Sequence, residues 1–146
     1  MGRFVNPDNS AFQVALNSEI YVDKTGLLSY TNKVLDTMQG YICNSRPRRF
    51  GKSITANMLT AYYSKGCSSK EMFSGLEISR AKDFEKHLNQ YDVIKINMQE
   101  FLSMSETMEE MLEMLKNYLI LDFKETFHEI QFRDEKNLIQ VMKDVF

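Results

Sequence analysis

The sequence contains only two cysteines, Cys43 and Cys67, and neither has a neighbour at the spacing of a metal site. Nothing in this pattern supports a disulfide framework. No apolar run approaches the length of a membrane span, and the N-terminus lacks the charged-then-apolar pattern of a secretory signal. We therefore expect a cytoplasmic protein that does not enter a membrane.

A strong net charge is also missing, because 18 basic residues stand against 20 acidic ones. This balance argues against a protein that coats nucleic acid. Internal repeats and low-complexity linkers are absent as well. With 146 residues, 43% hydrophobic and 26% charged, the chain has the composition of one globular domain with a sizeable core.

The positive charge is concentrated in one short segment. Arg46, Arg48, Arg49 and Lys52 fall within seven residues that contain no acid. Without these four residues, 14 basic residues remain against 20 acidic ones. Such a local concentration of charge favours an anionic ligand at this segment.

The basic segment lies between a predicted strand and a predicted helix. The apolar residues 41–43 predict a buried strand that includes Cys43, and Pro47 cannot continue a β-ladder. Residues 53–63 have apolar side chains at helical spacing. These are Ile54, Met58, Leu59 and Tyr62. The pattern predicts a strand, a turn and a helix.

Gly51, Lys52 and Ser53 stand at this turn, where a phosphate-binding loop has its glycine, lysine and serine. The first N–H groups of a helix and its dipole together attract anions. Gly51 would let the backbone approach a phosphate, Lys52 would contact the phosphates, and Ser53 would hold Mg²⁺ with the nucleotide. Arg48 and Arg49 would be secondary phosphate contacts.

The chain contains Tyr21-Val-Asp-Lys-Thr25, Arg46-Pro-Arg-Arg-Phe-Gly-Lys-Ser53 and Met72-Phe-Ser-Gly-Leu-Glu-Ile78. Together these segments resemble the bacterial AAA-ATPase-like family, whose members usually carry a PD-(D/E)XK nuclease-like domain further on. In that family the loop RPRRFGKS is usual, although the general phosphate-loop pattern has a glycine in place of Arg46. The family's second acidic metal motif does not occur here. The resemblance therefore implies ATP binding with little or no hydrolysis by this chain alone.

A second strand is predicted at Asp92–Met98, where β-branched residues are frequent. Two strands separated by helical segments imply a parallel pair. We therefore predict an α/β fold, a partial P-loop NTPase-like domain with a short parallel sheet flanked by helices, in which residues 1–146 form its N-terminal portion. Asn97 and Glu100 would follow the second strand and would either contact a metal-bound water or cap the next turn.

Helical patterns cover much of the remaining chain. Asp23 is predicted to cap a helix over residues 24–32, although Asp23 and Lys24 could instead border the nucleotide base. The longest helix is predicted over residues 107–123, and its periodicity excludes Asp122 as a metal ligand. Its predicted core stripe is Met108, Met111, Leu112, Leu115, Leu119 and Phe123. Asp134 is predicted to open a last helix.

Two other functions remain open. A short sheet would leave an exposed edge, so we expect a homo-oligomer or a protein partner to cover that edge or the C-terminal helices. The chain could then be a protein-interaction or inhibitor module that works without nucleotide. The arginine cluster Arg46, Arg48 and Arg49 could also bind a nucleic-acid backbone, but the net acidity does not favour this.

Overall fold

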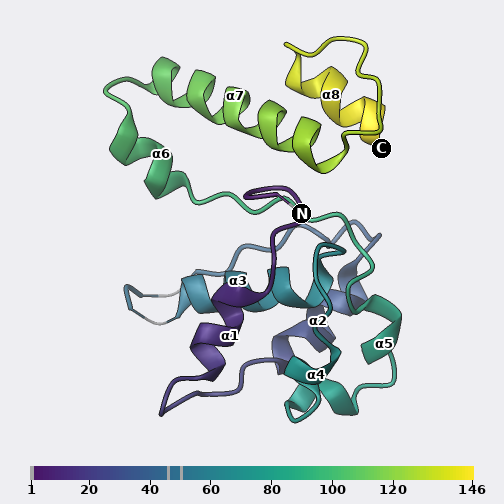
Figure 1. The fold of residues 1–146 in the computed structure, drawn as a ribbon. Helices are drawn as coiled ribbons and strands as arrows, with labels where there is room; N and C mark the ends of the chain where they lie inside the picture. Colours follow the sequence, from purple (N-terminus) through teal and green to yellow (C-terminus); the bar gives the residue numbers. More distant parts are fainter. Residues whose placement is uncertain (1, 46, 50) are drawn as a thin grey trace. The chain divides into compact units, whose positions relative to one another are not determined.

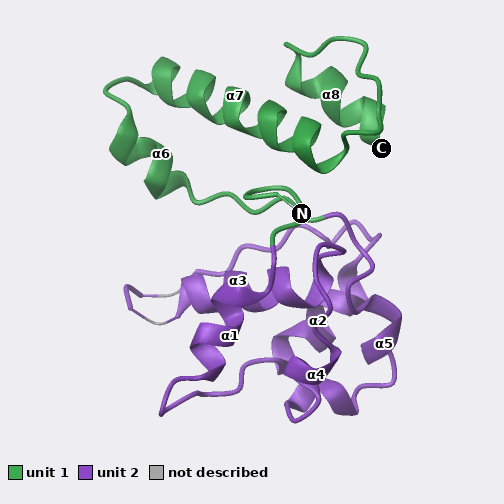
Figure 2. Ribbon diagram, viewed as in Figure 1, with its two compact units in different colours: residues 1–7, 93–146 green, residues 8–92 purple. Residues whose placement is uncertain are grey.

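A computed structural model describes residues 2–45, 47–49 and 51–146. Its helices are α1 (Ser10–Leu16), α2 (Gly26–Val34), α3 (Lys52–Tyr63), α4 (Lys70–Phe73), the 3₁₀ helix η1 (Glu77–Arg80), α5 (Phe84–His87), α6 (Met98–Met104), α7 (Met108–Thr126) and α8 (Leu138–Val145) (Figure 1). The chain forms two compact units (Figure 2). Unit 1 comprises residues 1–7 and 93–146, and unit 2 comprises residues 8–92.

The predicted parallel sheet is wrong. In the described parts of the chain, β-pairing is limited to two isolated bridges, an antiparallel one between Val5 and Ile94 and a parallel one between Ser64 and Tyr91. The predicted strand at residues 41–43 is instead exposed, and the side chain of Tyr41 is 97% accessible to solvent. Cys43, predicted to be buried, is exposed too. Apolar residues permit a strand, but a strand also needs a partner and a face to bury.

The predicted second strand runs beside the start of the chain. Asn6 N donates to Val93 O at 2.7 Å, and Lys95 N donates to Phe4 O at 2.8 Å. The direction is antiparallel at the bridge between Val5 and Ile94. Because the N-terminal residues supply the hydrogen-bond partners of this segment, it does not enter a crossover with residues 41–43.

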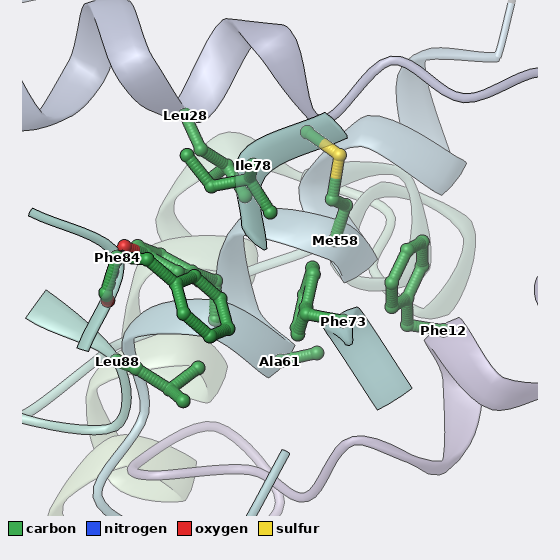
Figure 3. Close-up of a cluster of buried hydrophobic side chains, with 9 residues drawn as sticks. Phe12, Leu28, Met58, Ala61, Phe73, Ile78, Phe84 and Leu88 are labelled. Atoms are coloured by element: carbon green, nitrogen blue, oxygen red, sulfur yellow. Dashed lines mark hydrogen bonds between the residues drawn. The ribbon is translucent and has the colours of Figure 1, made fainter. Parts of the chain in front are cut away.

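The core of unit 2 includes Met58, Ala61 and Tyr62 of α3, and Figure 3 shows side chains of this cluster. Phe73 stacks on Phe12 with ring centroids 5.2 Å apart and meets Tyr62 edge-on at 5.5 Å. Helix α1 packs against α3 (Figure 1). The buried hydrophobic residues are Phe12, Leu28, Met58, Ala61, Tyr62, Phe73, Ile78, Phe84 and Leu88. This core holds the helix that begins at the Gly-Lys-Ser motif, and it confirms the helix predicted after the motif.

Hydrogen bonds also join α2 to α3. Asn32 Nδ2 donates to the Tyr62 hydroxyl at 3.1 Å, and the Tyr63 hydroxyl donates to Asn32 Oδ1 at 2.6 Å. The Thr31 hydroxyl lies 2.5 Å from that of Tyr63. Burial raises the pKa of Tyr63 to about 12, so this hydroxyl keeps its proton at neutral pH.

In unit 1, the long predicted helix is confirmed as α7. Thr107 caps it, and Glu110 completes a capping box by bonding back to the cap backbone. Met111, Leu119 and Phe123 are buried as predicted, but Met108 and Leu112 are 61% and 52% exposed. The last helix, α8, starts after Asn137 rather than at Asp134, because the Asn137 side chain accepts from the N–H groups of the first turn.

Asp122 lies within α7 and is buried. Its carboxylate accepts hydrogen bonds from the backbone N–H groups of Arg3 (2.8 Å), Phe4 (2.8 Å) and Val5 (2.6 Å). Asp122 therefore attaches the start of the chain to α7.

The two polar residues predicted to follow the second strand both have structural partners within unit 1. Asn97 caps α6 by accepting from Gln99 N at 3.2 Å. Glu100 forms an ion pair with Arg3. Of the two roles left open for Asn97, the structure shows the capping role.

Candidate functional site

The basic loop ends at the N-terminus of α3. Gly51 immediately precedes the helix and has φ of 77°, and Arg49 has φ of 69°. Glycine adopts this left-handed conformation without cost, whereas a residue with a Cβ is strained by about 1–2 kcal/mol. Arg46 and Phe50 of the motif lie outside the described residues. The chain thus turns sharply into α3, whose first N–H groups have no partners inside the helix.

Thr55 holds this turn from within α3. Its backbone N–H and its hydroxyl both donate to Gly51 O, at 2.9 and 3.0 Å. Thr55 is buried, whereas Arg48, Arg49, Lys52 and Ser53 are exposed. The predicted phosphate contacts are therefore accessible to a ligand, and Thr55 is a supporting residue that sequence reasoning missed.

A pocket of about 310 Å³ opens beside the loop within unit 2. Its described lining is Ala15, Ser18, Ile20, Tyr21, Val22, Lys24, Arg49, Gly51, Ile54, Thr55 and Met58. The N-cap Gly51 and the helical positions 54, 55 and 58 lie on one face of α3, and from Gly51 to Met58 that face runs for about 10 Å. The pocket is thus cationic and polar near the loop and apolar further along α3.

The segment before α2 forms the other wall of this pocket. Asp23 Oδ1 accepts from the N–H and the hydroxyl of Thr25, at 2.8 and 2.7 Å, and Asp23 Oδ2 accepts from Glu77 N at 2.7 Å. The Thr25 hydroxyl accepts in turn from Ile78 N at 3.1 Å. Helix α2 begins only at Gly26. The prediction that Asp23 caps the helix is therefore wrong, since Asp23 and Thr25 fasten this segment to η1.

Lys24 lies between these two anchored residues and reaches the loop. A Cβ added to Gly51 would lie 3.1 Å from Lys24 Nζ. Lys24, Arg49 and Gly51 line the same pocket, whereas Arg48, Lys52 and Ser53 lie at the loop but not in the pocket lining. The structure thus brings the Tyr21–Thr25 segment and the basic loop together around one cavity.

Comparison with known proteins identifies the family. A family model described as "AAA-ATPase_like: Predicted AAA-ATPase" matches residues 10–146. The chain belongs to the AAA-ATPase-like family. No curated protein and no solved structure matches the chain. Membership suggests nucleotide binding in general.

Among the helices of the described residues, none has both the length and the apolar character needed to cross a bilayer.

Two titratable side chains of the segment before α2 have shifted pKa values. Burial opposes ionisation of Asp23, but the hydrogen bonds from Thr25 and Glu77 and the charge of Arg80 outweigh it, so the pKa of Asp23 is lowered. Burial, together with the nearby charge of Asp23, raises the pKa of Tyr21. At neutral pH this segment therefore carries an ionised Asp23 and a neutral Tyr21.

The Asp23 anchor gives a pH-dependent prediction. Its pKa is lowered in the folded state, so its stabilisation is present above the unfolded pKa of about 3.9 and is lost as pH falls through the folded pKa. We expect Asp23→Asn to lower the urea midpoint of unit 2 at pH 7 and to have a smaller effect at an acidic pH that protonates Asp23 in the folded state. Unfolding curves of both proteins at the two pH values test this. An equal decrease of the urea midpoint at both pH values would show that the charge of Asp23 does not contribute to stability.

A metal would have few protein ligands at this site. In residues 2–45, 47–49 and 51–146, no group of three His, Cys, Asp or Glu side chains could hold an ion. The exposed hydroxyl of Ser53 in the first turn of α3 fits an ion that is held mainly by nucleotide phosphates, as Mg²⁺ often is. The donor set thus suits a metal that arrives with its nucleotide.

Proposed function

We propose that this AAA-ATPase-like chain binds ATP with Mg²⁺ at the start of α3, as part of a P-loop domain. The observation that carries the proposal is the pocket with cationic groups at the loop and apolar walls along α3. Its volume of about 310 Å³ is at the lower end of the range of about 300–1,000 Å³ for ligand sites. It would hold the sugar and base while the phosphates lie over the loop.

The residues have distinct roles in this proposal. Lys52 and the first N–H groups of α3 would bind phosphate oxygens, with Arg48 and Arg49 as further cationic contacts. Gly51 would allow the close approach, and Ser53 would bind Mg²⁺ together with the phosphates. When bound, Mg²⁺ would neutralise part of the phosphate charge. The helix start carries no acid in its first turn to repel the anion.

The apolar part of the pocket would contact the base. Tyr21, Ile54 and Met58 line it, and Tyr21 is held against Phe12 with ring centroids 6.1 Å apart. A partly buried aromatic ring offers a flat surface for a base. The described lining contains no carboxylate, whereas phosphoryl transfer needs an acid to hold metal and orient water. The proposal is therefore binding rather than turnover.

Titration calorimetry with Mg·ATP tests the proposal. We expect the wild type to bind and Lys52→Ala to bind at least tenfold more weakly, because a charge-assisted hydrogen bond contributes about 1.5–3 kcal/mol. Lys82→Ala is the matched control, since Lys82 is an exposed lysine of the same unit outside the pocket. Absence of binding by the wild type, or equal binding by wild type and Lys52→Ala, would contradict the proposal.

A protein-interaction role is the second candidate. Several apolar side chains of unit 1 are exposed, among them Leu102, Met104, Met108 and Leu112. Methionine-rich surfaces adapt well to partner proteins, and a second copy of the chain could also cover them. A Lys52→Ala variant whose biological activity equals that of the wild type would favour this role over nucleotide binding.

A further inference from the structure

The position of Lys24 suggests a role beyond those assigned above. We infer that Lys24 is a second phosphate-binding lysine, contributed to the loop by the Tyr21–Thr25 segment. This inference rests on the proposed nucleotide function. It names a residue that supplies charge to the phosphates from outside the Gly-Lys-Ser motif.

The distance between Lys24 and the loop is the first argument. A Cβ on Gly51 would lie 3.1 Å from Lys24 Nζ, so the ammonium group lies beside the backbone of Gly51. Gly51 directly precedes the first N–H groups of α3. A phosphate oxygen bound to these N–H groups would therefore lie close to the ammonium group, and a lysine ammonium has three donors to offer.

The attachment of the neighbouring residues is the second argument. Asp23 accepts three hydrogen bonds, two from Thr25 and one from Glu77 N, and Thr25 itself is fully buried. Both residues are bonded to the backbone at the start of η1. The backbone on each side of Lys24 is therefore held before a ligand arrives, and less ordering is needed on binding.

The charge of the pocket is the third argument. Lys24 and Arg49 are the two cationic side chains among its described lining residues, and that lining contains no carboxylate. Asp23, the neighbour of Lys24 in the sequence, accepts hydrogen bonds from Thr25 and from Glu77 N. An anion in the pocket would thus meet cations from two separate segments of unit 2.

The chemistry sets the class of ligand. An ammonium group is a compact point charge that binds phosphate oxygens without the fixed planar geometry of arginine. Lys24 should therefore contribute to any ligand with a phosphate chain near Gly51 and should accept arginine as a replacement. Lys24 should not strengthen the binding of the uncharged sugar and base.

The test uses Lys24→Met, which keeps much of the aliphatic stem, and Lys24→Arg, which keeps the charge. Calorimetry with Mg·ATP should show about tenfold weaker binding by Lys24→Met, or about 1.4 kcal/mol. Lys24→Arg should bind within about threefold of the wild type, because a charge-assisted contact remains. Lys82→Met, which removes the same charge from an exposed position outside the pocket, should bind as the wild type does.

Three results would overturn the inference. Equal Mg·ATP binding by wild type and Lys24→Met would do so while leaving the proposed function intact. Equally weak binding by Lys24→Met and Lys24→Arg would show that the shape of lysine matters rather than its charge. Absence of Mg·ATP binding by the wild type would remove the proposed function and this inference together.

Discussion

Replacing Phe73 with alanine is expected to destabilise unit 2 by about 4 kcal/mol. Phe73 is fully buried in α4, stacks on Phe12 and meets Tyr62 edge-on. Its loss would remove the contacts with both rings and leave a cavity in the core of unit 2. Domains are stable by about 5–15 kcal/mol in total, so the variant should unfold at much lower urea concentration or temperature.

Urea unfolding followed by far-ultraviolet circular dichroism measures this effect. The matched control is Tyr30→Ala, which removes an aromatic ring from the same unit at a position that is 52% exposed. The control should change stability by less than about 0.5 kcal/mol. A loss below about 1.5 kcal/mol for Phe73→Ala would mean that the core around α3 is not packed as described.

Replacing Asp122 with alanine is expected to destabilise unit 1 by about 3 kcal/mol. The change removes the shared acceptor of the Arg3, Phe4 and Val5 backbone N–H groups. The last two of these hydrogen bonds are buried, so their donors would be left without an acceptor in a region with little water. Unlike the loss of a surface ion pair, this carries the full desolvation cost of the donors.

Two companion variants isolate the role of the carboxylate in α7. Asp122→Asn retains one carbonyl acceptor and should lose less stability than Asp122→Ala. Glu125→Ala removes an exposed acid from the same helix and should be nearly neutral. Hydrogen exchange of the Phe4 and Val5 amides should accelerate in Asp122→Ala alone. Unchanged exchange at these amides would contradict the assigned attachment.

The helices were largely predictable because their signals are local. The spacing of apolar residues located α3 and α7, and Thr107 with Glu110 forms the capping box that marks the start of α7. The burial of individual side chains was less predictable. Met108 has the correct spacing for the core stripe and is nevertheless exposed, since burial also depends on which neighbouring element covers a given turn.

The sheet was not predictable, because a strand is defined by its partner. Residues 41–43 have suitable side chains, but they are exposed in the structure. The segment around Ile94 does pair, with Val5 from the start of the chain. No local pattern indicates that pairing, because the two segments lie far apart in the sequence. The predicted fold class was therefore wrong, because it paired the segment around Ile94 with residues 41–43 and not with Val5.

The candidate site, like the fold, could be predicted only in part. The Gly51-Lys52-Ser53 motif correctly located the helix start, and the role of Ser53 and its neighbours as ligands stays a prediction. The position of Lys24 beside Gly51 depends on tertiary structure, through the attachment of Asp23 and Thr25 to η1. Sequence reasoning favoured a simple helix cap for Asp23, since a local interaction is the only one that a local pattern can predict.

The insertion of unit 2 into unit 1 affects how the chain can fold. The contacts of Asp122 with the N-terminus span 117–119 residues, a separation that makes closure slow. Within unit 2, Ser69 links residues from near the two ends of the unit, because its hydroxyl accepts from Asn9 and its N–H donates to Asn89, both at 2.9 Å. The folded unit 2 therefore shortens the stretch of chain that must be closed. If unit 2 folds first, roughly 40 residues remain to be closed and the entropic cost falls by about 1 kcal/mol. Residues 8–92 also leave the ribosome before α7, so synthesis and chain entropy favour the same order of events.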